Sequence, residues 1–195
     1  MGTNLLFQRI AAVCVFIVLV CFVSVVGTAV LSYGGLVNSS QAVDAQWVSV
    51  QAAYKTRVDL VPEFGDAAAN LDRQDVKSAA SALALLDFFT GLDPNEAPTE
   101  QDLLDRVQDA QARFSPALAK LLSEGENSPD PATKARFHDL QKRFDDAGKQ
   151  IEIEQRRYNE AAAAFNQKIA RFPISLIAPT MSFYPKARFH DKVLE

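Results

Sequence analysis

The feature that most constrains this chain is a run of 22 apolar and small residues, Ile10–Leu31, near its amino end. There is no Asp, Glu, Lys, Arg or His between Arg9 and Asp44. As a helix, such a run is long enough to cross about 30 Å of hydrocarbon, so we expect a transmembrane anchor over residues 10–32. The alternative is a cleaved signal peptide, because Gly27-Thr28-Ala29 resembles a processing site, but the apolar core exceeds the usual length of roughly 7 to 15 residues.

The composition of the rest of the chain excludes several functions. Twenty basic residues stand against 24 acidic ones, a net charge of −4, and this lacks the basic excess that phosphate neutralisation requires. Both cysteines, Cys14 and Cys21, lie inside the apolar run. The two histidines, His138 and His190, are far apart, and the sequence has no HExxH pattern to complete a metal site. We therefore expect no nucleic-acid partner, no metal, no cofactor and no catalytic activity.

Beyond the apolar run, hydrophobic residues recur at steps of three and four, the spacing of helices with one buried face. This spacing predicts four helices, over residues 33–71, 74–89, 99–125 and 132–171. Pro62 and Pro116 fall inside the first and third helices, where each predicts a local bend. We expect the aromatic residues on the buried faces to form the core, namely Trp47, Tyr54, Phe64, Phe114, Phe144, Tyr158 and Phe165.

Short connections between helices favour antiparallel neighbours. The predicted fold is therefore all-α, an N-terminal transmembrane helix followed by an elongated antiparallel four-helix bundle. This divides the chain into an amino-terminal segment, an anchor, a bundle and an apolar, aromatic C-terminal tail, over residues 1–9, 10–32, 33–171 and 172–195.

The C-terminal tail is too rich in proline to continue the last helix and too apolar to be an ordinary solvated linker. Two arrangements remain open. In one the tail packs against the bundle, and in the other it contacts the membrane interface or another protein. The residues that we expect to make an interface or membrane contact are Tyr33, Phe172, Leu176, Ile177, Phe183 and Tyr184.

Several polar residues of the predicted helices are candidates for a buried structural network. Arg57 and Asp59 flank an apolar position, and we expect them to meet Arg157 or Asn159 on the returning helix. Asn159 and Asn166 lie seven residues apart, on one face of the fourth helix, so we expect an amide ladder against the first helix. These roles are structural, because no catalytic grouping emerges from the spacing.

Charge is divided along the chain. Residues 44–130 carry 7 basic and 16 acidic side chains, whereas residues 134–195 carry 12 basic and 8 acidic ones. The two parts can neutralise one another within the bundle. The functional alternative is a basic stripe directed at anionic lipid or an acidic partner, made of Lys142, Arg143, Lys149, Arg156, Arg157, Lys168 and Arg171.

Spaced motifs occur at both ends of the predicted bundle. Near its start are Tyr33-Gly34-Gly35-Leu36-Val37, Trp47-Val48 and Arg57-Val58-Asp59-Leu60-Val61-Pro62, which resemble the Y-N-x-L-V, W-x-x-V and R-x-D-L-I-P-N motifs of the bacterial LemA family. Near its end, Tyr158-Asn159, Phe165-Asn166 and Ile169-Ala170-Arg171-Phe172-Pro173 are similar to Y-N-x-x-V-x-x-Y-N-x-x-I-x-x-F-P. The resemblance covers nearly the whole chain. Gly34 and Glu63 stand where the family usually has asparagine.

The resemblance implies a single-pass membrane protein with a long helical bundle and no established catalytic activity, of a kind often discussed beside membrane proteases and envelope functions. We therefore expect a non-enzymatic scaffold or adaptor with protein partners in the envelope, among them a membrane protease complex or further copies of the chain. The alternatives are a membrane-surface, lipid-interacting module and an enzyme of unrecognised type.

The charges beside the apolar run also predict its orientation. Arg9 precedes the run, whereas the first basic residue after it is Lys55. Because basic residues concentrate on the cytoplasmic side of a membrane segment, we expect a cytoplasmic amino terminus. The protein would then lie in the bacterial inner membrane with its bundle in the periplasm.

Overall fold

The structure is a computed structural model that describes residues 2–60, 62–63, 84, 86–126 and 130–190. Over these residues it is all-α and has no strand, as predicted. Its elements are α1 (Gly2–Asp59), α4 (Gln101–Glu126), α5 (Pro131–Ile169), the short α6 (Ile174–Ile177) and the 3₁₀ turn η2 (Pro179–Met181).

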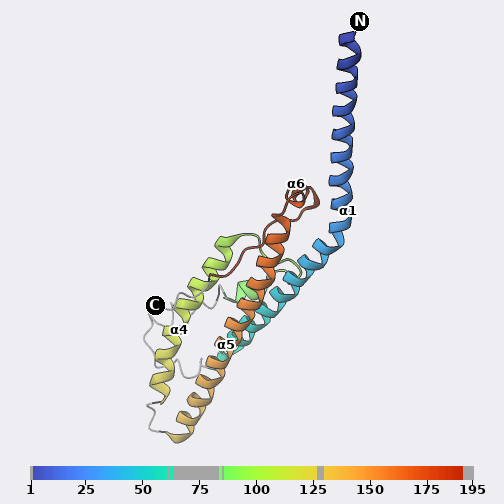
Figure 1. Ribbon diagram of the computed structural model, residues 1–195. Helices are drawn as coiled ribbons and strands as arrows, with labels where there is room; N and C mark the ends of the chain where they lie inside the picture. Colours follow the sequence, from blue (N-terminus) through green and yellow to red (C-terminus); the bar gives the residue numbers. More distant parts are fainter. Residues whose placement is uncertain (1, 61, 64–83, 85, 127–129, 191–195) are drawn as a thin grey trace.

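The three long helices lie side by side over the lower part of the molecule (Figure 1). α1 and α4 run away from the amino end, and α5 returns antiparallel to both. The predicted antiparallel pairing of the first and last long helices is therefore confirmed. Of the predicted helix over residues 74–89, residues 84 and 86–89 are helical, and residues 74–83 and 85 lie outside those described, as does most of the expected bend around Pro62.

α1 is continuous from the amino-terminal region into the bundle, and its upper half extends away from the other helices (Figure 1). At a rise of about 1.5 Å per residue, its 58 residues span about 85 Å. Within the residues that the structure describes, no helix has a stretch both long and apolar enough to cross a bilayer. The predicted anchor over residues 10–32 includes side chains outside that description, those of residues 10–11, 25–26 and 28–32.

The core lies mainly between the lower half of α1 and α5. Trp47, Tyr54, Tyr158 and Phe165 are fully buried, and Phe144 is 5% exposed, which confirms five of the predicted aromatic core residues. Phe64 and the side chain of Phe114 lie outside the described residues.

Two core positions differ from the prediction by one residue. The three-and-four spacing predicts that Leu103 and Ala161 are core residues, but both are only half-buried, whereas their neighbours Leu104 and Ala162 are fully buried. Adjacent residues on a helix point about 100° apart, so a face assigned from spacing alone is uncertain by one position where two apolar residues are neighbours.

The connection between residue 90 and α4 is held against α1 by polar side chains. The buried Gln51 amide donates to the carbonyl oxygens of Phe89 and Leu92, at 3.2 and 3.1 Å. The Trp47 indole donates to the carbonyl of Asp93 at 3.1 Å. Because the connection is fixed in this way, the start of α4 has a defined place beside α5.

The start of α5 has a complete N-cap. The Asp130 carboxylate accepts hydrogen bonds from the backbone N–H groups of Ala132 and Thr133, and Pro131 occupies the first turn, where its missing N–H costs nothing. This places the helix start one residue before the predicted Ala132. α5 ends at Ile169, two residues before the predicted Arg171.

Candidate functional site

The segment that follows η2 lies in a groove between α4 and α5. Its backbone runs without regular secondary structure from Phe183 to His190, and the Ala187 N–H donates to the carbonyl of Pro98 at 2.8 Å. Figure 1 shows this segment leaving α6 and passing between the two helices. Of the two arrangements left open by the sequence, packing against the bundle is therefore the one seen for residues 186–190.

On the α5 side, two asparagines hold the backbone of this segment. The Asn166 amide donates to the carbonyl of Lys186 and accepts from its N–H, both at 2.8 Å. The Asn159 amide makes the same pair of bonds with Phe189, again at 2.8 Å. Each asparagine therefore satisfies both backbone groups of one residue, as a neighbouring strand would.

The spacing of these asparagines shows that the segment is extended. Seven residues of α-helix separate Asn159 from Asn166, about 10.5 Å at 1.5 Å per residue. The residues that they hold are only three positions apart, and three residues of fully extended chain span about 10 Å. Two turns of helix thus match three residues of strand, and the segment antiparallel to α5 can bond both amides only when it is nearly straight.

On the α4 side, two glutamines at the same seven-residue spacing make equivalent contacts. Gln101 donates to the carbonyl of Arg188 at 2.7 Å and accepts from its N–H at 3.1 Å. Gln108 donates to the carbonyl of His190 at 2.9 Å and accepts from its N–H at 3.0 Å. We refer to the groove lined by these four side chains as the amide groove: Gln101, Gln108, Asn159 and Asn166.

Two side chains of the segment point into the protein. Ala187 is 6% exposed and Phe189 is 3% exposed. The Phe189 ring packs edge-on against Tyr158, with ring centroids 5.6 Å apart. The Tyr158 hydroxyl donates to the carbonyl of Ala187 at 2.9 Å. Burial raises the pKa of Tyr158, and the nearby Asp44 carboxylate raises it further, so the hydroxyl remains a donor over the physiological range.

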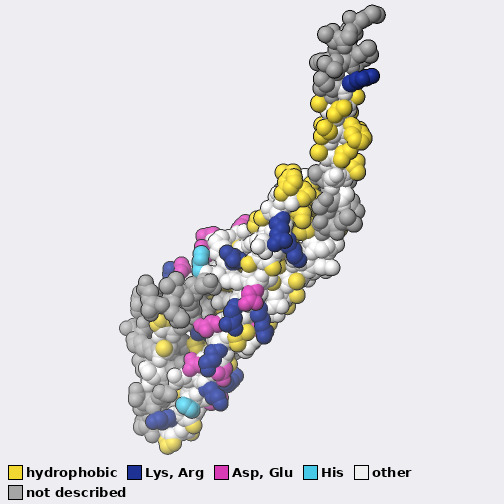
Figure 2. All heavy atoms as spheres, in the orientation of Figure 1, with side chains coloured by type: hydrophobic (Ala, Val, Ile, Leu, Met, Phe, Trp, Pro, Cys, Tyr) yellow, Lys and Arg dark blue, Asp and Glu magenta, His cyan; other side chains and the backbone are white. Residues whose placement is uncertain are grey.

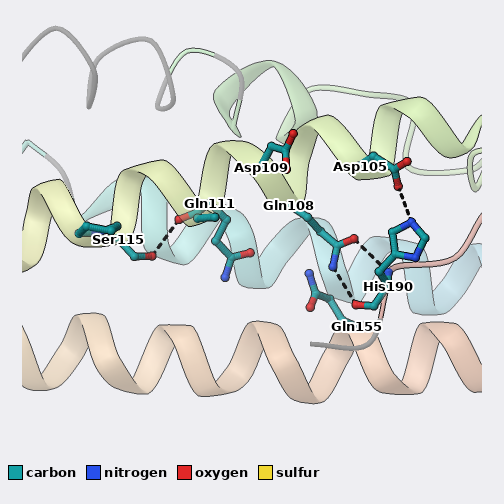
Figure 3. Close-up of a pocket in the computed structure, with 9 residues that line it drawn as sticks. Asp105, Gln108, Asp109, Gln111, Ser115, Gln155 and His190 are labelled. Atoms are coloured by element: carbon teal, nitrogen blue, oxygen red, sulfur yellow. Dashed lines mark hydrogen bonds and ion pairs between the residues drawn. The ribbon is translucent and has the colours of Figure 1, made fainter. Parts of the chain in front are cut away.

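Polar side chains hold the two ends of the segment. The Lys186 ammonium donates to the carbonyl of Ala97 at 2.9 Å and lies 3.6 Å from the Asp44 carboxylate, which accepts from the Ala97 N–H. At the other end, His190 Nε2 lies 3.1 Å from Asp105 Oδ1 (Figure 3). The Lys186 contact is the more buried of the two, since the side chains of Lys186 and Asp44 are only 10% and 21% exposed.

Beyond His190 the groove opens into a pocket of about 650 Å³ (Figure 3). Asp105 and Asp109 line it from α4, and Gln111 and Gln155 point toward one another across it from α4 and α5. The Tyr54 hydroxyl joins these two amides, since it donates to Gln111 Oε1 and accepts from Gln155 Nε2, both at 2.7 Å. Burial strongly raises the pKa of Tyr54, which keeps this hydroxyl protonated.

The structure rearranges the polar network expected from the sequence. Asn159 and Asn166 do form an amide ladder on one face of α5, but it holds the tail, so the expected ladder against the first helix is wrong. The reason is that the tail, which carries unpaired backbone groups, lies over this face.

The expected buried contact of Arg57 and Asp59 with Arg157 or Asn159 on the returning helix is also corrected. Arg57 is 5% exposed, donates to Ser115 Oγ at 3.1 Å and lies over the Phe144 ring at 3.9 Å. Burial lowers the pKa of its guanidinium. Asp59 instead pairs with Lys55 at the surface.

Arg157 is exposed and pairs with the buried Glu154 on its own helix at 3.0 Å. Other members of the predicted basic stripe are likewise paired with nearby acids. Arg143 makes two bonds of 2.8 Å to Glu63, and Lys149 lies 3.2 Å from Asp146. On the face shown in Figure 2, acidic and basic side chains are interspersed, which supports internal neutralisation.

The residues expected at an interface lie near the point where α1 leaves the bundle. Phe172, Leu176, Tyr184 and Tyr33 are 77%, 62%, 53% and 50% exposed. Phe183 is half-buried, with its ring centroid 6.1 Å from those of both Tyr33 and Phe165. Ile177 is half-buried as well.

Sequence reasoning missed Gln101, Gln108 and the segment that they hold. One signal was the seven-residue spacing, which the glutamines share with the two asparagines. A second was an internal repeat, because the five letters K-A-R-F-H occur at both Lys134–His138 and Lys186–His190. Among the described residues, no group of three His, Cys, Asp or Glu side chains could hold a metal ion.

These observations define an all-α protein in which two long helices hold an extended C-terminal segment by its backbone. The LemA family matches residues 46–193, which include the chain's single tryptophan, Trp47, and that segment, and the chain belongs to this family. A comparison with curated proteins finds no match.

Proposed function

We propose that this protein is a non-enzymatic, membrane-anchored helical scaffold or adaptor of the bacterial cell envelope, acting through protein–protein contacts. The observation that carries the proposal is the contrast between the two halves of α1. In the lower half Val43, Trp47 and Tyr54 are fully buried, whereas in the upper half Phe16 and Val18 are 67% and 68% exposed. Large apolar side chains so exposed on an isolated helix call for an apolar surrounding.

In this proposal residues 10–32 cross the inner membrane once, with the amino terminus in the cytoplasm and the bundle in the periplasm. Figure 2 supports it in outline, since the described part of the upper α1 carries apolar side chains. In the sequence, Arg9 precedes this apolar run. The continuous helix would then hold the bundle at a fixed distance from the bilayer, where it can present its surface to other envelope proteins.

Two experiments test the anchor and its orientation. Membranes washed with alkaline carbonate should retain the full chain, because a spanning helix is not released by disrupting surface electrostatics. With both native cysteines replaced by alanine, an impermeant maleimide should label Lys134→Cys in spheroplasts. Labelling only after inner-membrane permeabilisation would place the bundle in the cytoplasm, and release by carbonate would contradict the anchor.

The proposed partners are envelope proteins, among them a membrane protease complex, and further copies of the chain. Photo-crosslinking in native membranes followed by mass spectrometry identifies them. The absence of catalysis is tested on the purified chain with broad hydrolase substrates. Turnover that copurifies with the chain and disappears in the Asp59→Ala variant would favour the enzyme alternative.

A membrane-surface module is the second candidate, favoured by the exposed Phe172, Leu176 and Tyr184 near the exit of α1. Aromatic and aliphatic residues in such a place are suited to the headgroup region. A nitroxide at Leu176→Cys in a cysteine-free full chain, reconstituted into nanodiscs, should be more accessible to oxygen than to a water-soluble nickel complex. A label at Lys134→Cys is the matched control, and equal accessibility at both sites would exclude membrane contact.

A further inference from the structure

The geometry points to a second role for the amide groove. It is a binding site for an extended segment of another polypeptide, and the chain's own residues 186–190 occupy the groove and compete with that segment. The segment that fits has a basic residue, a small residue, any residue, an aromatic residue and a second basic or hydrogen-bond-donating residue, in that order. This inference rests on the proposed adaptor function and names the class of partner that the adaptor would bind.

The groove binds backbone groups of the segment rather than its side chains alone. Four side-chain amides, on Gln101, Gln108, Asn159 and Asn166, each donate to a carbonyl and accept from the N–H of the same residue, at 2.7 to 3.1 Å. These eight bonds are available to any extended segment, whatever its side chains, as in other sites that bind a peptide as an added strand. The two-turn spacing of the asparagines selects an extended backbone and excludes a helix.

Only certain side chains of the segment contact the groove. Phe189 and Ala187 are 3% and 6% exposed, and Lys186 bonds the Ala97 carbonyl beside Asp44. Arg188 is exposed, and the only contacts the structure gives it within the described residues are those of its backbone. The site therefore specifies the first, second and fourth positions and leaves the third free.

Acidic side chains lie at both ends of the groove. Asp44 receives the first basic residue, and Asp105, which pairs with His190, is followed by Asp109 along the same side of the groove. An acidic segment would be repelled at both ends, whereas a basic one is complementary to the groove.

The groove continues beyond His190 as a pocket. The pocket of about 650 Å³ lies in line with the segment and has the same kind of lining, the amides of Gln111 and Gln155 and the hydroxyl of Ser115. Tyr54 holds one atom of each amide, the Oε1 of Gln111 and the Nε2 of Gln155. The remaining Gln111 Nε2 is a donor and the remaining Gln155 Oε1 is an acceptor, the two groups that a further backbone residue requires.

α4 and α5 also contact one another directly, so the helices do not depend on the segment alone for their association. The segment can thus be released while the groove keeps its shape. An attached segment competes at an effective concentration in the millimolar range, so a partner must either bind tightly or be present at high local concentration.

The test uses the full chain in detergent micelles and a fluorescent synthetic peptide with the sequence of residues 184–191 as the probe. In the Lys186→Ala/Phe189→Ala variant the resident segment loses its two main anchors. We expect the probe to bind this variant at least 10-fold more tightly than the wild-type chain. Adding Asn159→Leu to that variant should weaken probe binding at least 10-fold, because both backbone bonds to one residue are lost.

Probe variants test the side-chain pattern. Phe189→Ala and Lys186→Glu in the probe should each weaken binding at least 10-fold, whereas Arg188→Ala should leave it within about twofold. Circular dichroism and thermal unfolding establish that each protein variant is folded. A folded double variant that does not bind the probe, or that binds all probe variants equally, would overturn the inference.

The identity of the occupant is tested separately. Isotopically heavy and light copies of the wild-type chain are mixed in one membrane and photo-crosslinked from Gln108. Crosslinks that join Gln108 of a heavy copy to the tail of a light copy, or the reverse, would show that the occupant is a second copy and would overturn assignment to a different protein. Crosslinks to another protein would support it. None of these outcomes depends on the carbonate or labelling tests of the anchor.

Discussion

At the residue scale, the Tyr54 hydroxyl has the most consequential position in the described core. It is fully buried and bridges α1 to an amide on α4 and another on α5. Removing it would leave Gln111 Oε1 and Gln155 Nε2 without this partner, and an unsatisfied buried group costs about 1 to 3 kcal/mol.

We therefore expect Tyr54→Phe to lower the free energy of unfolding of the full chain by about 1 to 3 kcal/mol. Urea titration in a mild detergent, followed by circular dichroism, measures the change. Tyr184→Phe is the matched control, because Tyr184 is 53% exposed, and it should change stability little. Equal midpoints for both variants would mean that the bridge contributes nothing.

Tyr54 and Tyr158 together predict how the free energy of unfolding responds to high pH. Burial raises the pKa of both Tyr54 and Tyr158 well above that of an exposed tyrosine, about 10. The folded state therefore holds protons that the unfolded state has released, and this stabilisation is full below about pH 10 and declines as pH rises above it.

Unfolding midpoints measured between pH 8 and 11.5 should thus fall more steeply for the wild-type chain than for a Tyr54→Phe/Tyr158→Phe variant. Normalising each series to its own value at pH 8 separates this slope from the constant loss of hydrogen bonds. Parallel slopes would show that neither tyrosine keeps its proton in the folded state.

Sequence reasoning reached the correct residues at this scale more often than the correct contacts. The seven-residue spacing of Asn159 and Asn166 established that both amides share one face of a helix. What they bond could not be inferred, because the partner is backbone in a segment with no periodic pattern. Arg57 was likewise identified as buried, but its contacts with Ser115 and Phe144 come from residues far away in sequence.

At the element scale, the repeated sequence K-A-R-F-H shows why helices are easier to predict than the tail. Lys134–His138 is helical and Lys186–His190 is extended, although their residues are identical. The first copy follows the Asp130 cap and continues into a long apolar face on α5. The second follows Pro185 and bonds to side chains on two other helices. Local signals decide the first case and tertiary contacts the second.

Helix starts are local features, and the Asp130 cap gives a prediction of its own. Hydrogen bonds from the Thr133 hydroxyl, and from the backbone N–H groups of Thr133 and Ala132, lower the pKa of the Asp130 carboxyl. Because the folded-state pKa is depressed, the stabilisation is present above the unfolded value of about 3.9 and is lost as pH falls through the folded value.

We expect Asp130→Ala to increase hydrogen exchange of the amides in the first turns of α5 at pH 7, with little effect near the centre of the helix around Ile151. Asp130→Asn keeps an acceptor oxygen and should have a smaller effect. In the wild-type chain the same amides should lose protection on acidification below about pH 4, and in the alanine variant they should not. Protection that is equal in all three proteins would exclude a role for the cap.

At the scale of the whole molecule, the described side chains of residues 12–24, in the part of α1 that leaves the bundle, are exposed, as are Phe172 and Leu176 near its exit. Gly34 and Gly35 lie in this part of α1, and a Cβ atom built at either would meet nothing within 4 Å. Their small size is therefore not needed for contacts in the described part of one chain. In lipid, small residues allow two helices to approach closely.

The all-α class and the antiparallel pairing of α1 with α5 were predictable because they depend on long, regular patterns. The apolar spacing of α1, α4 and α5 extends over many turns, so an error of one position at Leu103 or Ala161 did not change these features. A single sequence contains no comparable pattern for contacts between molecules. Exposed Phe172 and Leu176 indicate a surface that favours contact, and the partner must be found by experiment.

The surface near the exit of α1 predicts lateral assembly in the membrane. If Gly34 and Gly35 serve contacts between neighbouring chains in the membrane, a photoreactive residue at Tyr33 should crosslink to a second copy, or to a larger membrane partner, in native membranes. A second probe at Ser182, beside the half-buried Phe183, should give the same partner, because the Tyr33 and Phe183 rings lie 6.1 Å apart. Replacing Gly34 and Gly35 with leucine should then reduce crosslinking from Tyr33, since bulky residues keep helices apart, while leaving the bundle's unfolding midpoint unchanged. A probe at Lys134 is the control and should not report this partner. Monomer alone from both Tyr33 and Ser182, in membranes that hold every native partner, would rule out assembly through this surface.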